Sequence, residues 1–140
     1  MNVDEIKNGI VIDHIKAGKG MEIYRLLGLE SLDCPIAIIK NALSRRMDRK
    51  DIIKVDTDAE LDLSVLGYID ADVTVNVIKN GVNVKKYHPE LPREIVDIVK
   101  CKNPRCITST EQELAHVFKL TDPDTRTYRC IYCESKAKNH

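Results

Sequence analysis

Alternating hydrophobic and polar positions dominate the first half of the chain. Residues 9–15 are rich in β-branched side chains, and their alternation predicts a strand. Strict alternation places Ile12 and His14 on one face of this strand. Asp13 and Ile15 then point to the opposite face, so that the two adjacent polar side chains are expected to diverge.

A helical pattern follows the first strand. The apolar positions of residues 21–27 recur at helical spacing until Gly28, which is a common residue at the end of a helix. Residues 34–40 and 51–55 predict two further strands. The polar and basic residues 42–49 between them are predicted to be a connection.

A second helix is predicted after the third strand. Thr57 or Asp58 can cap it, and it should end near Asp70. Its apolar positions follow an i, i+4, i+5, i+8 pattern. They are Leu61, Val65, Leu66 and Ile69.

The dipeptide Asn80-Gly81 predicts a hairpin between residues 73–78 and 82–86, because both residues tolerate positive φ. The resulting order of elements, with one hairpin strand added, fits a split β-α-β sheet. We therefore predict an α+β protein with a ferredoxin-like N-terminal sheet domain whose helices lie on one face.

Two prolines mark the end of this sheet. Pro89 and Pro92 favour extended backbone over helix. They predict a boundary between an N-terminal domain, residues 1–90, and a C-terminal domain, residues 91–140. The second domain should be small and mostly β, with strands at residues 115–120 and 126–130.

Composition describes a globular protein. Of its 140 residues, 43% are hydrophobic and 31% are charged. No apolar run approaches the length of a membrane span, and the chain opens without a signal-peptide core, so we expect a cytoplasmic protein with no membrane partner. Lys plus Arg equals Asp plus Glu at 22 each, which gives no global field for nucleic acid.

Four cysteines in the second half have the spacing of a metal site. Cys101 and Cys106 enclose four residues, and Cys130 and Cys133 enclose two. Two such knuckles present four thiolates to one structural Zn²⁺, which leaves no open position for a reactive water. The alternatives are two disulfides or four unrelated buried thiols. The odd fifth cysteine, Cys34, and the absence of a signal peptide favour zinc.

The sequence contains none of the common catalytic or phosphate-loop motifs. Binding is better indicated, because Asp13 and His14 interrupt an apolar strand, although one of them could simply be a solvated strand end. If the third and fifth strands bring Lys54 and Lys86 near Asp13, the site gains two cations for a polyphosphate and a carboxylate for a ribose or base.

The same stretches are similar to a known family. They are Val11-Ile12-Asp13-His14-Ile15, Arg49 to Lys54, Thr74-Val75-Asn76, Lys86 with Pro89 and Pro92, and the cysteines with Asn103, Tyr132 and Glu134. In this order and over essentially the whole length, the chain resembles the regulatory chains of aspartate carbamoyltransferase.

This resemblance implies a non-catalytic subunit whose N-terminal domain binds CTP and ATP as effectors. Asp13 would meet the ribose, Lys86 the ribose and phosphate, and Lys54 the base. His14, Lys50 and Asn76 match positions linked to the same or a neighbouring nucleotide, and the backbone of residues 3–6 and Ile12 would read the base. The four cysteines would bind Zn²⁺: Cys101, Cys106, Cys130 and Cys133.

The resemblance also implies partners. The zinc domain would dock on the catalytic chain, and the N-terminal domains would pair as a regulatory-chain homodimer within a holoenzyme of six catalytic and six regulatory chains. Three residues depart from the family pattern: Asp48, Gly81 and Arg105. By the resemblance, changes at Asp48 and Gly81 would bear on nucleotide preference, and the change at Arg105 on the contact with the catalytic chain.

Two other functions remain open at this point. A zinc-ribbon module that binds nucleic acid is suggested by Lys102, Arg105, Arg126 and Arg129 near the cysteines. Net charge and the lack of aromatic platforms weigh against it. An enzyme using Asp13 and His14 as acid and base is disfavoured by their predicted opposite faces.

Overall fold

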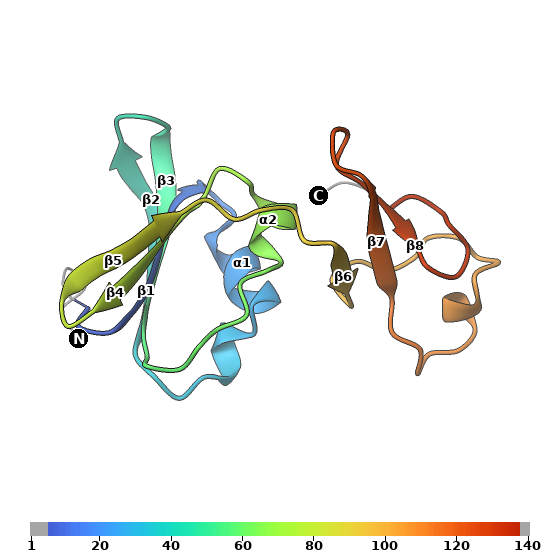
Figure 1. The fold of residues 1–140 in the computed structure, drawn as a ribbon, viewed down its shortest axis with the longest axis horizontal. Helices are drawn as coiled ribbons and strands as arrows, with labels where there is room; N and C mark the ends of the chain where they lie inside the picture. The colour runs from blue at the N-terminus through green and yellow to red at the C-terminus, as the bar shows by residue number, and fades with distance from the viewer. Residues whose placement is uncertain (1–5, 138–140) are drawn as a thin grey trace. The chain divides into compact units, whose positions relative to one another are not determined.

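The computed structural model describes residues 6–137. The chain forms two compact units, Met1–Glu90 and Leu91–His140, which are described separately (Figure 1). The first unit contains five strands and three short helical segments. In chain order these are β1 (Gly9–Lys16), α1 (Gly20–Leu26), the 3-10 turn Leu29–Ser31, β2 (Ile36–Ser44), β3 (Asp48–Asp56), α2 (Leu66–Ile69), β4 (Thr74–Lys79) and β5 (Val82–Tyr87).

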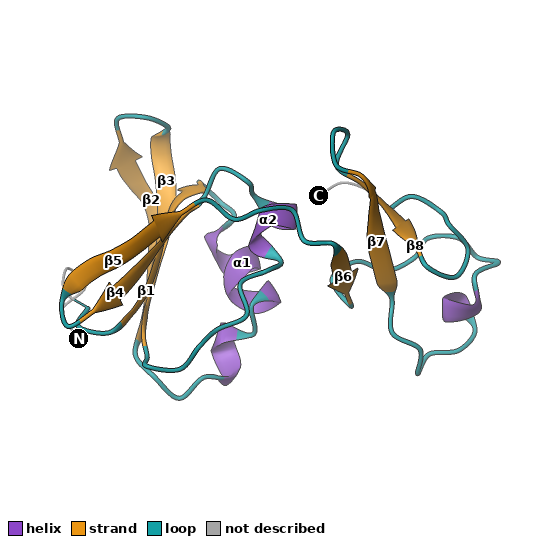
Figure 2. Cartoon of the chain, in the orientation of Figure 1, coloured by secondary structure: helices purple, strands orange, loops and turns teal. Residues whose placement is uncertain are grey.

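The five strands form one antiparallel sheet in the order β2-β3-β1-β4-β5. Strand β3 separates β1 from β2, which is the arrangement of a split β-α-β unit. Both helices lie on the same side of this sheet (Figures 1 and 2). They close a core that includes Ile12, Ile53, Val75, Ile23 and Leu66, each fully buried. The predicted α+β class is confirmed.

The first strand departs from the predicted alternation. Asp13 and His14 together oppose one residue of β3, which is a β-bulge, and His14 has φ of 58°. Because the bulge inserts one residue, Ile15 returns to the core face and is fully buried. The prediction that Asp13 and His14 point to opposite faces is therefore wrong. Both side chains lie on the sheet face that carries no helix, called the open face below.

The predicted second helix is mostly wrong. Only Leu66–Ile69 is helical, and it ends at Asp70 as predicted. Leu61, Leu63 and Val65 pack against the core while Asp62 and Ser64 between them are exposed, so this segment alternates with an extended period of two. The carboxylate of Asp62 accepts the N–H of Ser64, a local bond that competes with a helix.

Residues 42–49 were predicted as a connection, but β2 and β3 extend through most of them around a turn at residues 45–47. A second bulge at Lys40 and Asn41, where Asn41 has φ of 61°, hides the alternation of β2. The hairpin prediction is confirmed, since Asn80 and Gly81 both have positive φ between β4 and β5.

The second unit contains a three-stranded antiparallel sheet in the order β6-β7-β8. Its strands are β6 (Glu94–Val96), β7 (Val117–Asp122) and β8 (Thr127–Cys130), and a 3-10 turn covers Ile107–Ser109. Its buried apolar residues are few: Ile95, Phe118, Tyr128 and the cysteines Cys106 and Cys130. A core of this size ordinarily needs a metal or disulfides. None of the helices within residues 6–137 is long and apolar enough to cross a membrane.

Candidate functional site

Strand register gathers polar side chains on the sheet face that carries no helix. Val11 is paired with Lys54 of β3 on one side and with Asn76 of β4 on the other. Asn76 is paired in turn with Lys86 of β5. Because the neighbouring residues Ile12, Ile53 and Val75 are buried in the core, this row faces the open side. Four neighbouring strands thus form a row with a lysine at each end, Lys54 and Lys86, and with Val11 and Asn76 between them.

Asp13 and Lys50 form an ion pair at the edge of this row. Lys50 Nζ lies 2.9 Å from Asp13 Oδ1, and both side chains are mostly shielded from solvent. Burial raises the pKa of Asp13, but the hydrogen bond and charge of Lys50, together with the N–H of His14, outweigh it, so that the pKa lies below its ordinary value. Asp13 is therefore an ionised acceptor at neutral pH.

The bulge turns the imidazole of His14 toward the same face. Its Nδ1 lies 3.2 Å from Oγ1 of Thr74, which is almost fully buried. Burial lowers the pKa of His14, and the charges of Lys50, Arg46 and Lys86 lower it further, against the opposing effect of Asp13. The imidazole is thus neutral at physiological pH, and the cationic side chains of Lys50, Arg46 and Lys86 lie nearby.

Asn76 is held in place by two hydrogen bonds. Its Nδ2 donates to the carbonyl of Val11 at 3.4 Å, and its Oδ1 accepts from Nδ2 of Asn83 at 2.9 Å. Asn83 is a contributor that sequence reasoning missed, because the β4-β5 bulge after Val77 decides which residues of β5 share its face. The amide of Asn76 is therefore oriented without a ligand.

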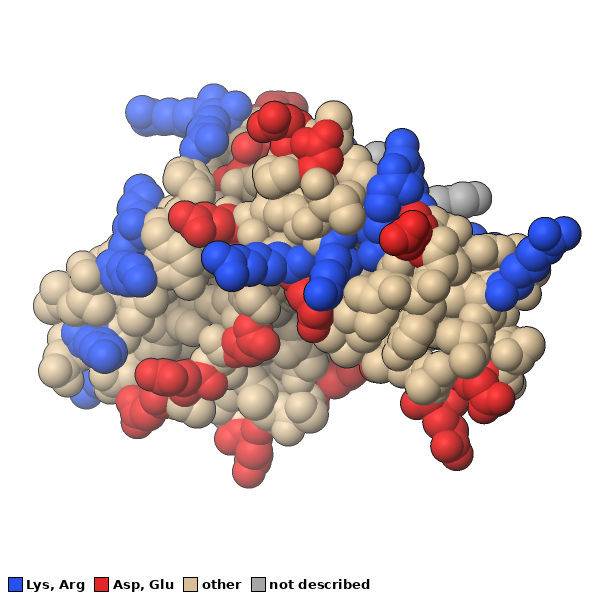
Figure 3. Space-filling model, turned by 45° about the vertical axis from the view of Figure 1, so that its right-hand side comes forward, with Lys and Arg blue, Asp and Glu red and all other residues tan. Residues whose placement is uncertain are grey.

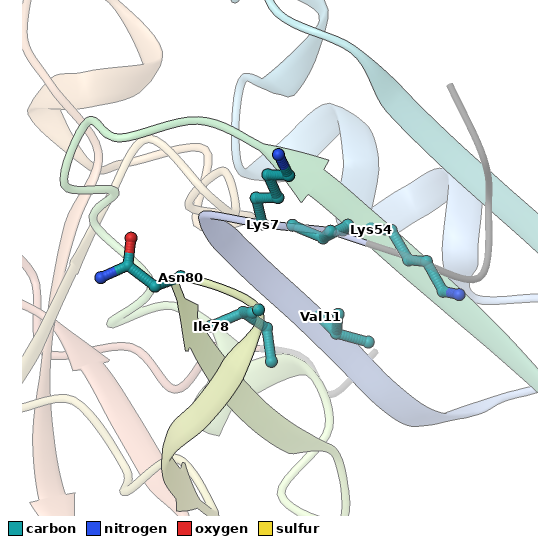
Figure 4. Close-up of a pocket in the computed structure, with 7 residues that line it drawn as sticks. Lys7, Val11, Lys54, Ile78 and Asn80 are labelled. Atoms are coloured by element: carbon teal, nitrogen blue, oxygen red, sulfur yellow. The ribbon is translucent and has the colours of Figure 1, made fainter.

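An open hollow of about 610 Å³ adjoins the row. Figure 4 shows Val11 and Lys54 on neighbouring strands beside it, with Ile78 and Asn80 at the β4-β5 hairpin. The full lining is Ile6, Lys7, Val11, Lys54, Ile78, Asn80 and Gly81. No sequence pattern predicts that Lys7, Ile78 and Asn80 line one site, since they come together only in the folded sheet unit.

The remaining predicted nucleotide contacts would be made by backbone groups. The side chain of Ile12 is fully buried among the core residues, which leaves only its backbone for the predicted role. Of the predicted backbone segment 3–6, residues 3–5 lie outside the described residues. Ile6 lines the hollow and is itself largely buried.

The four cysteines of the second unit converge on one point. Their sulfur atoms all lie within 4.8 Å of one another. Cys101 Sγ lies 3.5 Å from Cys133 Sγ, and Cys106 Sγ lies 3.7 Å from Cys130 Sγ. With Zn–S bonds near 2.3 Å, tetrahedral geometry separates sulfurs by about 3.8 Å, whereas a disulfide requires about 2.05 Å. All five cysteines are free, so the arrangement fits a structural zinc ion and not disulfides.

Two side chains outside the cysteine set support it. The buried hydroxyl of Thr108 donates to Cys106 Sγ at 3.1 Å, and the N–H of Cys101 donates to Nδ1 of His116 at 3.1 Å. Burial raises the pKa of the Cys101 thiol to about 12, while the hydrogen bond from Ser135 lowers that of Cys133 to about 6. Metal binding must therefore displace the proton of the Cys101 thiol, which the fold alone retains at neutral pH.

Comparisons with known proteins agree for both units. Residues 1–90 match the family described as "Aspartate carbamoyltransferase regulatory chain, allosteric domain", and residues 93–140 match its "metal binding domain". Proteins named aspartate carbamoyltransferase regulatory chain are similar over nearly their whole length. That of Clostridium botulinum (strain Hall) is 48% identical, covering 96% of this chain and 92% of the relative. That of Bifidobacterium longum is 41% identical, covering 99% of each.

Proposed function

Since the chain belongs to the family of aspartate carbamoyltransferase regulatory chains, we propose that its N-terminal unit binds CTP and ATP and passes their effect to a catalytic chain. The family assignment makes it a regulatory subunit with a catalytic-chain partner and a metal-binding domain. Beyond this assignment, we propose which effectors bind and which residues bind them.

The observation that carries the proposal is the row Lys54, Val11, Asn76 and Lys86 on the open face. A triphosphate carries several negative charges, and each lysine contact to it contributes about 1.5–3 kcal/mol. The two lysines belong to strands separated by β1 and β4, so that an extended ligand can contact both.

The hollow beside Lys54 is suited to the base of the nucleotide. Ile6, Val11 and Ile78 supply apolar surface, and Asn80 supplies an amide. In this arrangement Asp13 accepts from a ribose hydroxyl, Lys86 serves ribose and phosphate, and Lys50, His14 and Asn76 complete the site. A Cβ at Gly81 would meet no atom within 4 Å, so the missing side chain leaves the hollow open and affects which base fits.

Regulation requires that each nucleotide bind two quaternary states with different affinity. Such coupling is typically about 1–3 kcal/mol, and it is reciprocal between effector and substrate sites. The regulatory chain therefore needs contact with its partner as well as an effector site. We assign the first to the zinc unit and the second to the sheet unit.

The zinc unit presents apolar side chains beside its cysteines. Ile107, Ile131 and Tyr132 are 49%, 42% and 46% exposed, and each is adjacent in sequence to a cysteine of the cluster. Exposed apolar side chains concentrated in one place are characteristic of interfaces. We assign this surface to the catalytic chain, with Zn²⁺ held by Cys101, Cys106, Cys130 and Cys133 fixing its shape.

A regulatory-chain homodimer in the cytoplasm completes the proposal. The edge strands β2 and β5 carry Leu43, Val82 and Val84, each more than half exposed, and exposed sheet edges are prone to pairing. The rival nucleic-acid module gains less support. Arg129 donates to the carbonyl of Glu134 within its own unit. The face shown in Figure 3 carries acidic as well as basic side chains, and its lower edge is acidic.

Calorimetric titration of the zinc-loaded chain with CTP and with ATP tests this proposal. Lys86→Ala should weaken binding by roughly tenfold or more. Lys85→Ala is the matched control, because Lys85 is the neighbouring residue of β5 and lies instead over the ring of Tyr87. Equal affinity in both variants would exclude the assigned site. Binding of labelled RNA or DNA without any response to CTP would favour the zinc-ribbon alternative.

A further inference from the structure

One buried carboxylate joins three separate segments of the sheet unit. Asp51 of β3 is fully buried. Its Oδ2 accepts the N–H groups of Gly18 at 3.1 Å and Gly20 at 2.9 Å, in the connection between β1 and α1. Its Oδ1 accepts the N–H of Asn41 in β2 at 2.8 Å. Three backbone N–H groups from two other segments thus converge on one buried side chain, which makes Asp51 a strong local anchor.

Asp51 also lies between the bulge of β1 and the bulge of β2. In β1 the bulged residues Asp13 and His14 oppose Ile52, the next residue along β3. In β2 the bulged residues Lys40 and Asn41 oppose Asp51 itself. A bulge leaves a residue outside the regular ladder, and the Asp51 carboxylate supplies the acceptor that Asn41 lacks.

Gly20 is fitted to this carboxylate. A Cβ at position 20 would lie 2.8 Å from Oδ2 of Asp51, closer than carbon and oxygen normally approach. The absence of a side chain therefore lets the backbone of the β1-α1 connection reach the carboxylate directly. The end of β1, just after its bulge, is tied to β3 through this contact.

We propose that Asp51 is a positioning residue of the nucleotide site. It fixes the two bulges, and through them the geometry that brings Asp13 and His14 onto the open face and pairs Asp13 with Lys50 at 2.9 Å. The inference rests on the proposed function for its effect on nucleotide affinity. Its structural part, the control of the Asp13–Lys50 pair, stands independently of that function.

The test compares Asp51→Asn with a variant of similar stability. The amide keeps the shape but turns one acceptor into a donor that faces backbone N–H groups. Leu29→Ala removes a buried side chain on the helix side of the sheet and serves as the matched control. The Asp13 pKa is measured by NMR and CTP affinity by calorimetry, both well below the unfolding midpoint.

Asp51→Asn should raise the Asp13 pKa toward its ordinary value and weaken CTP binding by roughly tenfold, and Leu29→Ala should do neither. If Asp51→Asn does not fold, Gly20→Ala replaces it in the same two measurements, because its Cβ would disturb the contact between the Gly20 N–H and Asp51 Oδ2. An unchanged Asp13 pKa in the folded variant overturns the inference. Absence of CTP binding to the wild-type chain would defeat the proposed function alone, because the pKa comparison still decides the role of Asp51.

Discussion

Lys50 Nζ and Asp13 Oδ1 lie 2.9 Å apart across β3 and β1, beside a bulge that no sequence pattern marks. Burial raises the Asp13 pKa, but the hydrogen bond and charge of Lys50, together with the N–H of His14, outweigh burial and lower it. The pair therefore stabilises the fold only while Asp13 is ionised. Its contribution is present above the unfolded pKa of about 3.9 and is lost as pH falls through the lower folded value.

Lys50→Met should therefore reduce the free energy of unfolding by about 1 kcal/mol at pH 7 and by much less near pH 2. Urea denaturation at the two pH values measures this difference. Lys79→Met, which removes the same charge at the exposed end of β4, is the control. Equal pH dependence in the two variants would show that the Asp13–Lys50 pair contributes nothing.

Nucleotide binding should take up protons through His14. Burial and the charges of Lys50, Arg46 and Lys86 lower the pKa of the free imidazole, against the opposing effect of Asp13. A bound triphosphate places negative charge nearby and raises that pKa, so affinity should strengthen as pH falls from about 8 toward about 6.

Calorimetry in buffers of different ionisation enthalpy measures the protons taken up on CTP binding. His14→Asn is the suitable variant, because φ of 58° is a conformation that Asn tolerates. The nucleotide's own phosphate titrates in both proteins, so the difference between them reports His14. Identical uptake in wild type and variant would remove His14 from the site.

The sheet was predictable where its pattern is regular. Alternation identified residues 9–15, 51–55 and 73–78, and Asn80-Gly81 identified the hairpin, because these signals depend only on neighbouring residues. The bulges were not predictable. His14 and Asn41 adopt positive φ for contacts made by distant residues, Thr74 with the His14 ring and Asp51 with the Asn41 amide.

The charged and polar residues of the candidate site were predictable, but the hollow beside them was not. Lys54, Asn76 and Lys86 could be named from the resemblance, and register then places them in one row. The hollow beside them depends on Lys7 and Asn80, which meet only when the sheet is formed. The second helix was not predictable in its true extent, because Leu61, Leu63 and Val65 pack on the core with a period of two, which the helical spacing of Leu61 and Val65 alone conceals.

Cys101→Ala should unfold the zinc unit and leave the sheet unit folded. Structural zinc contributes about 10 kcal/mol or more to folding in small domains, and the second unit has few other buried residues. NMR amide spectra with a zinc assay measure both units at once. Cys34→Ala is the control, since Cys34 lies outside the cluster and should keep one zinc. Collapse of both units in Cys101→Ala would contradict their independence.

The hydroxyl of Thr108 should slow the loss of zinc. It is 4% exposed and donates to Cys106 Sγ at 3.1 Å, and a hydrogen bond to a buried thiolate is worth about 1.5–3 kcal/mol. Thr108→Val keeps the shape without the donor and should release zinc to a chelator roughly tenfold faster, whereas Thr108→Ser should retain it. Thr110→Val is the control, because the Thr110 hydroxyl donates to the carbonyl of Ile107 and not to sulfur.

If Thr108→Val released zinc at the wild-type rate, the contact between the Thr108 hydroxyl and Cys106 Sγ would have no part in holding the metal. If Thr108→Ser were as fast as Thr108→Val, packing of the methyl group would explain the effect instead.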